Sequence, residues 1–476
     1  LQKTKYSFYN LKNFKFINCE ERNDLETNND VKKVNDLYKI LIEELSIFLN
    51  KYHKKNFSKK FWEIIIGPWT KDFLGIFYER YISVKKALTI EEIDNIILAN
   101  YSKHDLSNYN VLDLINKSSN DINKWNTILY TIIFEQLNQN NKKKLLKNKI
   151  IENLENPKKK SDNKLSFKKF IIFIMEKLSK RNLSKKNFFI YKLDLKFKYL
   201  FYLFFTLKQF PIISGENEYK KEKINITLRE NFNFDKTNTS EFERIIRLKL
   251  KYFLPTDIIE NFENLLSKVK KLEWPKNPKY IFTSYGYHGD TIFSFYLANK
   301  VEQGSKYILH QHGSNYFTGK NTIVDCGFSS CDKFISWGDP NNEKCIPLFN
   351  SKNLEIETND LGGERIIFFA PKMSPNRKRP HDEYGKIIRD SIIFEEALDN
   401  LSHDLKKKTI LKLYNSVADT DELEIKILKE IVFKRNNFKI EKSKINKELI
   451  KKSKILVHIG DGTAFLECLA TKKPTI

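Results

Sequence analysis

Cysteine, methionine, glycine and proline are all scarce in this chain, and it has no long hydrophobic run. There are 5 Cys, 2 Met, 15 Gly and 12 Pro among 476 residues. So few cysteines, without paired spacing, argue against a disulfide-stabilised scaffold and indicate a reducing compartment. The longest apolar run covers residues 199–207, whereas a membrane-spanning helix needs roughly 20 apolar residues. We therefore expect a soluble, cytoplasmic protein without a membrane span or a signal peptide.

Basic residues are abundant, which raises the question of a nucleic-acid partner. Lys and Arg number 84 against 60 Asp and Glu, a formal net charge of +24. Asn and Ile accompany the lysines, as in 140–164, which is typical of a compositional bias. No helix-turn-helix, RRM, KH or zinc-finger pattern occurs, so we do not expect nucleic acid as a partner. Lysines interleaved with aromatics at 166–173 and 194–205 favour peripheral contact with an anionic inner membrane.

The first part of the chain is predicted to be mostly helical. From about residue 30 to about residue 270, apolar positions recur at helical spacing. A break is expected near Gly67-Pro68, because proline lacks an amide hydrogen. Thr256 or Asp257 should cap the last helix of this region. The expected helices include 31–52, 61–88, 241–252 and 257–271.

Short strands alternate with helices after Pro275. Strand-like segments at 280–284 and 307–311 flank a helical segment at 290–303. This is the pattern of a βαβ unit with parallel strands and a right-handed crossover. A third strand is expected at 333–337. We therefore expect 275–340 to form a parallel sheet.

A second alternation of predicted strands and helices follows a polar linker at 351–364. The predicted fold is therefore α/β, with two Rossmann-like units and a large helical N-terminal region. We expect an acceptor-side domain over 1–350 and a nucleotide-donor-binding domain over 365–476. Both ends look cut, so we expect the second domain to be incomplete. Its expected strands are 365–370, 409–413, 438–441 and 455–459, and its expected helices are 384–401, 422–433, 446–451 and 464–471.

Polar side chains follow two neighbouring strands of the first unit. His288 and Asp290 lie in the loop after one strand, and His312 and Gly313 directly follow the next. Because parallel strands end at the same edge of a sheet, we expect these residues to converge on one crevice. An unperturbed His, with a pKa near ~6.5, suits a general base, and glycine permits close backbone approach. We expect His312 to be the base, assisted by His288 or Asp290. The alternative is that His312 only covers the end of the sheet.

Metal binding is not expected. His310 shares a strand face with His312, but no further Asp or His pattern follows. The cysteines between 326 and 345 match no common zinc spacing. The D-x-D pattern at 419–421 binds metal and nucleotide in other transferases, but here it directly precedes a predicted helix, where these residues favour capping. We therefore expect no metal and no resident cofactor.

A glycine-rich turn joins the last predicted strand to the last predicted helix. Gly460 and Gly462 lie in this turn, Thr463 begins the helix, and Glu467 follows one turn later. The N–H groups at a helix start bind phosphate, and we expect Thr463 to cap this helix and its hydroxyl to contact a phosphate oxygen as well. Glu467 shares a helix face with Thr463, where its carboxylate can accept hydrogen bonds from ribose hydroxyls. We expect a nucleotide site here, and a plain connection with a surface Glu is the alternative.

A basic loop follows the first predicted strand of the second unit. Residues 371–381 include Arg377 and Arg379 and should overhang the same crevice. Guanidinium groups suit a diphosphate, so we expect both arginines to contact the donor. A solvated basic loop is the alternative in so basic a chain.

At these motifs the sequence resembles a bacterial family of transferases linked to surface-carbohydrate synthesis, with a glycosyltransferase-B-like fold. His312-Gly313 is also similar to the His-Gly motif of CDP-glycerol glycerophosphotransferases, which implies a base role for His312. Segment 462–476 is similar to the donor-binding segment of many glycosyltransferases. In retaining members a Glu stands where this chain has Ile459, so the chain departs from the retaining pattern. The similar segments are 49–53, 61–69, 78–81, 311–316, 319–320, 337–338, 463–470 and 474–476.

Three functions are compatible with these residues. The first is transfer of a sugar or related group from a nucleotide-sugar donor to a glycan or lipid-linked acceptor, with helix-start N–H groups and arginines meeting the leaving diphosphate. The second is transfer of a polyol phosphate from a CDP-linked donor. The third is a scaffold or RNA-binding protein that keeps the fold without catalysis. We expect the first.

Overall fold

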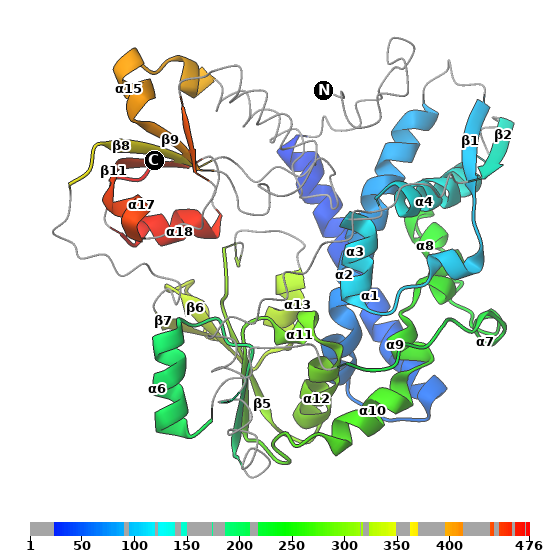
Figure 1. Ribbon diagram of the computed structural model, residues 1–476. Coiled ribbons are helices and arrows are strands. Elements are labelled where there is room, and N and C mark those ends of the chain that lie inside the picture. The colour runs from blue at the N-terminus through cyan, green and yellow to red at the C-terminus, as the bar shows by residue number, and fades with distance from the viewer. Residues whose placement is uncertain are drawn as a thin grey trace.

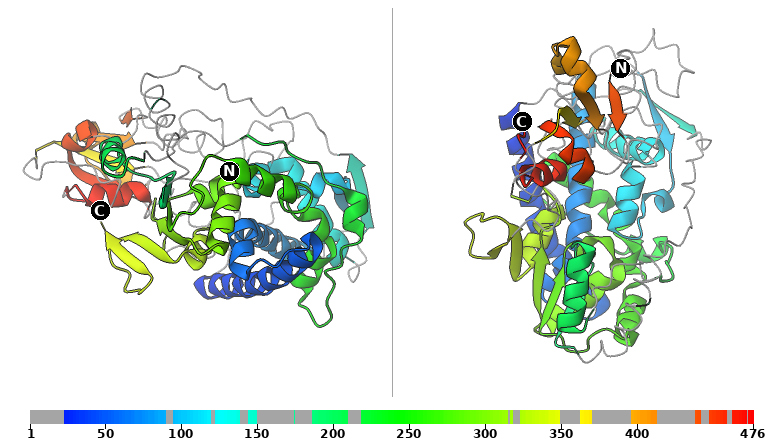
Figure 2. Two further views of the ribbon diagram at one scale, coloured as in Figure 1. Left: turned by 90° about the horizontal axis from the view of Figure 1, so that it is seen from below. Right: turned by 60° about the vertical axis from the view of Figure 1, so that its left-hand side comes forward.

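A helical region, two larger parallel sheets and one two-stranded parallel sheet make up the computed structural model (Figure 1). The predicted mixed α/β class with an N-terminal helical region is therefore confirmed. Figure 2 shows the four-stranded parallel sheet near the C-terminus at the far end of the molecule from the two-stranded sheet of β1 (Asn95–Asn100) and β2 (Lys144–Lys149). The structure describes residues 23–89, 95–119, 122–138, 144–149, 174, 186–209, 218–314, 316–317, 323–348, 362–369, 396–412, 438–441, 447–458, 462–471 and 473–476.

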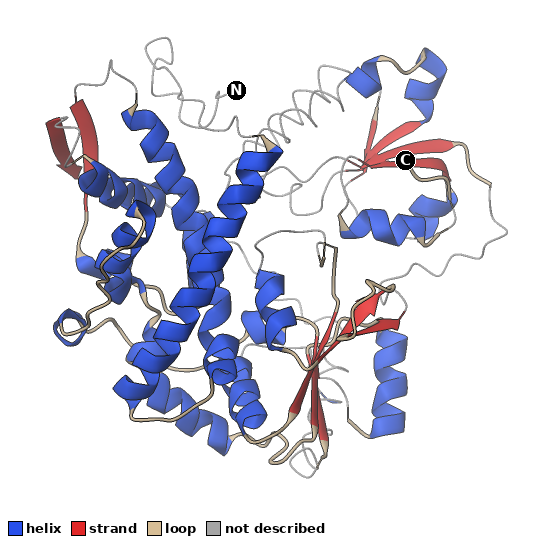
Figure 3. Ribbon diagram, turned by 180° about the vertical axis from the view of Figure 1, so that it is seen from behind, coloured by secondary structure: helices blue, strands red, loops and turns tan. Residues whose placement is uncertain are grey.

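Two long helices, α1 (Asp24–His53) and α2 (Lys59–Leu88), pack side by side in the helical region (Figure 3). Helix α1 begins with a capping box, in which Asn23 and Glu26 exchange side-chain-to-backbone hydrogen bonds. Helix α2 is buried almost all round, which explains why its apolar residues are not confined to one face. The predicted break at Gly67-Pro68 is wrong, because α2 runs through Pro68. Burial of the neighbouring side chains on both sides holds the helix together despite the missing amide hydrogen.

Shorter helices complete the helical region around this pair. The helix predicted over 257–271 is divided at Asn261, whose amide donates to the Thr256 carbonyl and whose side chain donates to Lys220. Thr256 and Asp257 lie inside the first piece and do not cap it, because Pro255 stands at the N-cap. The helices are α3 (Val111–Ser119), α4 (Ile122–Leu137), α7 (Ile226–Glu230), α8 (Glu241–Phe253), α9 (Thr256–Ile259) and α10 (Phe262–Lys271), with a 3-10 turn at Lys103–Leu106.

Three strands interrupt the region that was predicted to be helical. Two of them, β1 (Asn95–Asn100) and β2 (Lys144–Lys149), form a small parallel sheet of their own. The third, β3 (Phe188–Tyr191), belongs to the larger first sheet. Neither β2 nor β3 was predicted, because lysines interrupt the apolar pattern of β2 and β3 has only four residues.

The first large sheet has five parallel strands in the order β3-β4-β5-β6-β7. The parallel βαβ unit predicted for 275–340 is confirmed, with strands β4 (Tyr280–Thr283), β5 (Lys306–His310) and β6 (Lys333–Trp337). The edge strand β7 (Cys345–Leu348) was not predicted. The helices that follow the strands are α6 (Phe197–Leu207), α11 (Gly286–Gly289), α12 (Thr291–Glu302) and α13 (Ile323–Ser330).

The second sheet has four parallel strands in the order β10-β9-β8-β11. The chain starts at the central strand β8, moves outward, and returns to the other side of β8 with β11, so the switch point lies between β8 and β11. Thr475 continues the sheet beside Leu456, as predicted for the last residues. The elements are β8 (Arg365–Phe369), α15 (His403–Lys408), β9 (Thr409–Lys412), β10 (Lys439–Glu441), α17 (Lys447–Lys451), β11 (Ser453–His458) and α18 (Thr463–Leu469).

Among the described residues, hydrophobic packing joins the helical region to the first sheet, whereas the second sheet has its own cluster. Trp69 and Phe73 of α2 share one core with Tyr191 of β3 and Leu309 of β5. The second sheet has a separate core around Leu456. The boundaries at 1–350, 351–364 and 365–476 stay predictions, and the helix predicted over 422–433 lies outside the described residues, as does most of the one over 384–401.

Candidate active site

The two sheets meet where the loop after β5 touches the start of α18. The Ser314 amide donates a hydrogen bond to Thr463 Oγ1 at 3.1 Å. A Cβ atom at Gly313 would lie 3.1 Å from the same oxygen, so glycine allows the approach without displacing Thr463. Gly313 and Thr463, which were predicted on different units, therefore lie next to each other.

Two histidines stand at the carboxyl edge of the first sheet. His312 follows β5, and His288 sits on the single turn α11 after β4. Their ring centroids are 6.2 Å apart, so the predicted convergence of these side chains is present in the structure. The Nδ1 atom of His312 shares a 2.6 Å hydrogen bond with the Tyr316 hydroxyl. Burial raises the pKa of Tyr316 well above its usual value, so this hydroxyl stays protonated.

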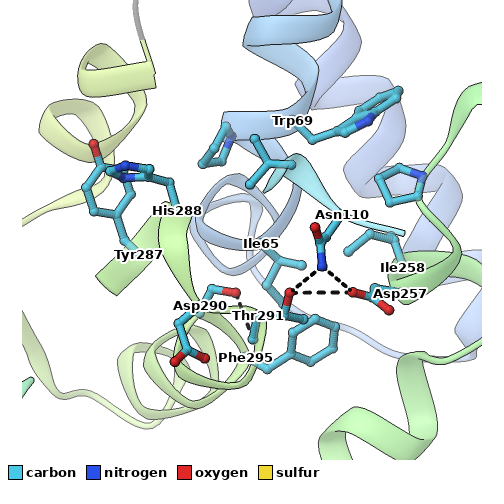
Figure 4. Close-up of a pocket in the computed structure, with 14 residues that line it drawn as sticks. Ile65, Trp69, Asn110, Asp257, Ile258, Tyr287, His288, Asp290, Thr291 and Phe295 are labelled. Carbon is cyan, nitrogen blue, oxygen red and sulfur yellow. Dashed lines mark hydrogen bonds between the residues drawn. The ribbon is translucent and has the colours of Figure 1, made fainter. Parts of the chain in front are cut away.

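Asp290 lies close to the histidines in sequence, but its carboxylate is used to hold the fold. It caps α12 by accepting from the Phe293 amide at 3.0 Å. It also accepts a 2.5 Å hydrogen bond from Tyr191 and forms a 3.2 Å ion pair with Lys192. The carboxylate is buried and points away from the His288 ring (Figure 4). Its surroundings therefore suit a positioning group better than a proton acceptor.

The end of β3 contributes polar residues that sequence reasoning missed. Lys192 is buried and has a left-handed backbone with φ of 46°, a conformation that costs energy outside glycine. The Asp194 amide donates to Ser284 Oγ at 3.0 Å, and the same Oγ lies 3.2 Å from His310 Nδ1. No residue pattern pointed to this edge, because β3 itself was hidden in a region that was predicted to be helical.

Three of the residues predicted to bind the donor, Gly462, Thr463 and Glu467, lie at the start and in the first turns of α18. Gly462 occupies the N-cap position, and Thr463 is the first residue inside the helix. The prediction that Thr463 caps this helix is therefore wrong. Thr463 and Glu467 are both half-buried and stand one turn apart on this helix. Arg377, Arg379 and Gly460 lie outside the described residues, as does the D-x-D pattern at 419–421.

A third histidine lies at the switch point of the second sheet. His458 ends β11 and stacks on Phe369, the last residue of β8, at 3.9 Å between ring centroids. Burial lowers the pKa of His458 to about 4, so the imidazole is neutral at pH ~7. Within the described part of the chain, its buried Nε2 atom has no hydrogen-bond partner. His458 therefore offers one unused polar atom where ligands of such sheets bind.

A polar pocket lies beside the histidine pair, between α2, α3, α9 and the start of α12 (Figure 4). It holds about 380 Å³ of empty space, part of it open to solvent, and His288 is in its lining. The Asn110 amide donates to Asp257 at 3.2 Å and to Thr291 at 3.1 Å, and the Tyr219 hydroxyl also donates to Asp257. Burial raises the pKa of Asp257 to about 6, and the hydrogen bonds from Tyr219 and Asn110 only partly oppose this rise.

The Asp257→Asn variant should become more stable relative to the wild type as pH rises. Because the folded-state pKa is raised above the unfolded value near 3.8, protonation of Asp257 favours the native state, and that contribution is fully present below pH ~3.8 and lost as pH rises through ~6. The variant does not titrate at this position. Urea unfolding at several pH values should show the difference between variant and wild type growing by up to about 3 kcal/mol between pH ~4 and pH ~7. A pH-independent difference would contradict the raised pKa.

No metal site is present among the described residues, since no three His, Cys, Asp or Glu side chains there are placed to hold an ion. Four cysteines, Cys326, Cys331, Cys345 and Cys468, are free thiols. Within the described ranges, no helix is long and apolar enough to cross a membrane.

The fold and the site together define an α/β protein whose two larger parallel sheets are joined by a contact between the loop after β5 and the start of α18. The chain belongs to the LIC12162 family transferases, whose family model matches residues 1–476. The family description makes the protein a transferase and hence an enzyme. Neither a curated protein nor a solved structure matches the chain.

Proposed function

We propose that the protein transfers a sugar or a related group from a nucleotide-activated donor to a surface-polysaccharide or other glycan acceptor. The contact between Ser314 and Thr463 carries this proposal, because it brings the His312 loop to the start of α18. A group bound at α18 would thus lie next to a candidate base on the other unit. Membership of a transferase family supports group transfer, and a parallel sheet with its ligand crevice at the carboxyl edge supports a nucleotide donor.

His312 is proposed as the base that deprotonates the acceptor hydroxyl. Because Nδ1 is engaged with Tyr316, the proton must be taken by Nε2. This requires the tautomer in which Nδ1–H donates to the Tyr316 oxygen. Tyr316 then fixes both the tautomer and the ring orientation, while His288 lines the same edge and Asp290 keeps α12 in place.

The donor is proposed to bind through its phosphates and ribose at the second sheet, as a substrate and not as a resident cofactor. Gly313, Gly462 and Thr463 would meet the phosphates, and Glu467 would accept hydrogen bonds from the ribose hydroxyls. Gly460, Arg377 and Arg379 are proposed for the same phosphates from their place in the sequence. The protein is proposed to act in the cytoplasm on a glycan or lipid-linked acceptor, without nucleic acid as a partner.

A second candidate is transfer of a polyol phosphate from a CDP-linked donor. The His312-Gly313 pair favours it, because the same pair occurs in glycerophosphate transferases and now lies against Thr463. Product analysis separates the two reactions, since phosphorus enters the acceptor only in the second. A non-catalytic scaffold or RNA-binding protein that keeps the fold is the third alternative.

A thermal-shift panel tests the nucleotide donor directly. We expect one of UDP, CMP, CDP and GDP to raise the Tm, because a ligand that binds only the native state stabilises it by about 2.7 kcal/mol at a hundredfold excess over Kd. RNA should give no such shift. Stabilisation by RNA and by none of the nucleotides would contradict the proposal and favour the scaffold.

The Thr463→Val variant should bind that nucleotide about three- to tenfold more weakly, because it loses one hydroxyl contact worth about 1 kcal/mol. Binding is measured by titration calorimetry. Thr237→Val is the matched control, since Thr237 is an exposed threonine of the helical region. Equal affinity of the Thr463 variant and the control would remove Thr463 from the donor site.

A further inference from the structure

Helix α6 (Phe197–Leu207) is unusually apolar for its position on the surface. Its sequence is FKYLFYLFFTL, and it carries one charged residue, Lys198. Of its side chains that the structure describes, only Leu200 is buried. A surface helix of a soluble protein normally turns a polar face to water. The sequence of α6 is therefore explained neither by the core nor by contact with water.

Two large aromatic side chains of α6 face solvent. Tyr202 is 67% exposed and Phe205 is 69% exposed. Exposed aromatic residues on one element mark an interaction surface. The helix lies on the far side of the first sheet from α12 and α13 (Figures 1 and 3), so this surface is separate from the core that joins that sheet to the helical region.

In the sequence, the charged residues from 195 to 209 are all basic. No Asp or Glu occurs between 195 and 209, whereas Lys196 and Lys198 stand at its start and Lys208 follows its end. Lys198 and Lys208 are both exposed. Aromatic rings between lysines suit a bilayer interface, where the rings enter the headgroup layer and the ammonium groups stay at anionic headgroups. The helix is about 16 Å long, too short to span a membrane.

We propose that α6 is a membrane-docking helix, which lies in the interface of an anionic bilayer with Tyr202 and Phe205 inserted and its flanking lysines on the lipid headgroups. This inference does not depend on the reaction. It does have a consequence for the site, because the loop that leads from β3 into α6 carries Lys192 and Asp194. The Asp194 amide is bonded to Ser284 at the carboxyl edge of the first sheet, so docking would hold that edge close to lipid-borne acceptors.

Vesicle co-sedimentation of the full chain tests the proposal. Wild-type protein should bind vesicles of phosphatidylcholine mixed with phosphatidylglycerol, and bind phosphatidylcholine alone much more weakly, with binding reduced by salt. The double variant Tyr202→Ser/Phe205→Ser should lose at least roughly tenfold in affinity for the anionic vesicles. The variant Lys198→Gln/Lys208→Gln should also lose affinity, but only at low salt.

The matched control removes equally exposed apolar side chains from another face. Leu25 and Ile47 of α1 are 69% and 64% exposed, and Leu25→Ser/Ile47→Ser should bind vesicles like the wild type. Circular dichroism and the Tm check that each variant is folded. Equal vesicle binding by the α6 variant and the α1 variant would overturn the proposal. So would a concentration-dependent dimer that only the α6 substitutions dissociate, because a second copy would then be what covers the helix.

Discussion

The His312→Ala variant should lose transfer activity by about 10²–10⁴-fold, the usual contribution of a positioned general base. Nucleotide binding should stay within a factor of about two, since in the described part of the chain it is Gly313 and Ser314 that approach Thr463 on the donor side. The measurement is kcat with the nucleotide-activated donor identified in the thermal-shift panel, together with Kd for the nucleotide. Loss of kcat without loss of binding is the expected pattern.

Two control variants separate catalysis from a general effect of losing a histidine. His104 is exposed in the helical region, and His104→Ala should be fully active. Tyr316→Phe removes the partner of His312 Nδ1 and leaves the base in place, so we expect a loss of only about tenfold in kcat and a shifted pH–rate profile. Full turnover by His312→Ala would sink the assignment, and it would leave His288 as the candidate base.

The Asp290→Ala variant should be destabilised by about 3–5 kcal/mol, because it leaves a charge buried without its partner. Lys192 pairs with Asp290 at 3.2 Å, and the side chains are 8% and 2% exposed. The same substitution removes the cap of α12 and the acceptor of the Tyr191 hydroxyl. Urea unfolding measures the loss, and activity should fall only in proportion to the folded fraction.

A double-mutant cycle shows whether the charge pair is the cause. Lys192→Met together with Asp290→Asn removes both charges and keeps a capping side chain at 290, so the double variant should recover most of the stability that each single variant loses. If Asp290→Asn instead has the free energy of unfolding of the wild type but no activity, the carboxylate takes part in the reaction and the positioning role is wrong.

Many of the strands could be predicted, because their local sequence patterns match the secondary structure that the fold requires. The strands β4, β5, β6, β8 and β11 are short apolar runs bounded by turn residues, and each was predicted within one or two residues of its observed limits. Pro68 shows why other parts of the fold could not be predicted. A proline normally ends a helix, but tertiary burial of α2 outweighs the lost hydrogen bond, and that burial cannot be seen in a local window.

Some residues of the candidate site could likewise be predicted from local sequence patterns, and others could not. His288, His312, Gly313 and Thr463 were identified because each directly follows or precedes a recognisable strand or helix. Lys192, Tyr316 and His458 were missed for a different reason. Lys192 follows a strand that was not predicted, Tyr316 is placed by its hydrogen bond to His312, and His458 is placed by stacking on Phe369 of the neighbouring strand. All three features arise only after the chain has folded.

The Thr463 hydroxyl has one hydrogen to donate and two lone pairs to accept with. It accepts from the Ser314 amide, so its own hydrogen can point to a donor phosphate. A phosphate that takes this hydrogen polarises the hydroxyl and strengthens the bond to Ser314. Nucleotide binding would thereby draw the His312 loop toward the second sheet, and by thermodynamic reciprocity a bound acceptor would hold the nucleotide more tightly. The two substrates would then bind synergistically, with each lowering the Kd of the other by the same factor.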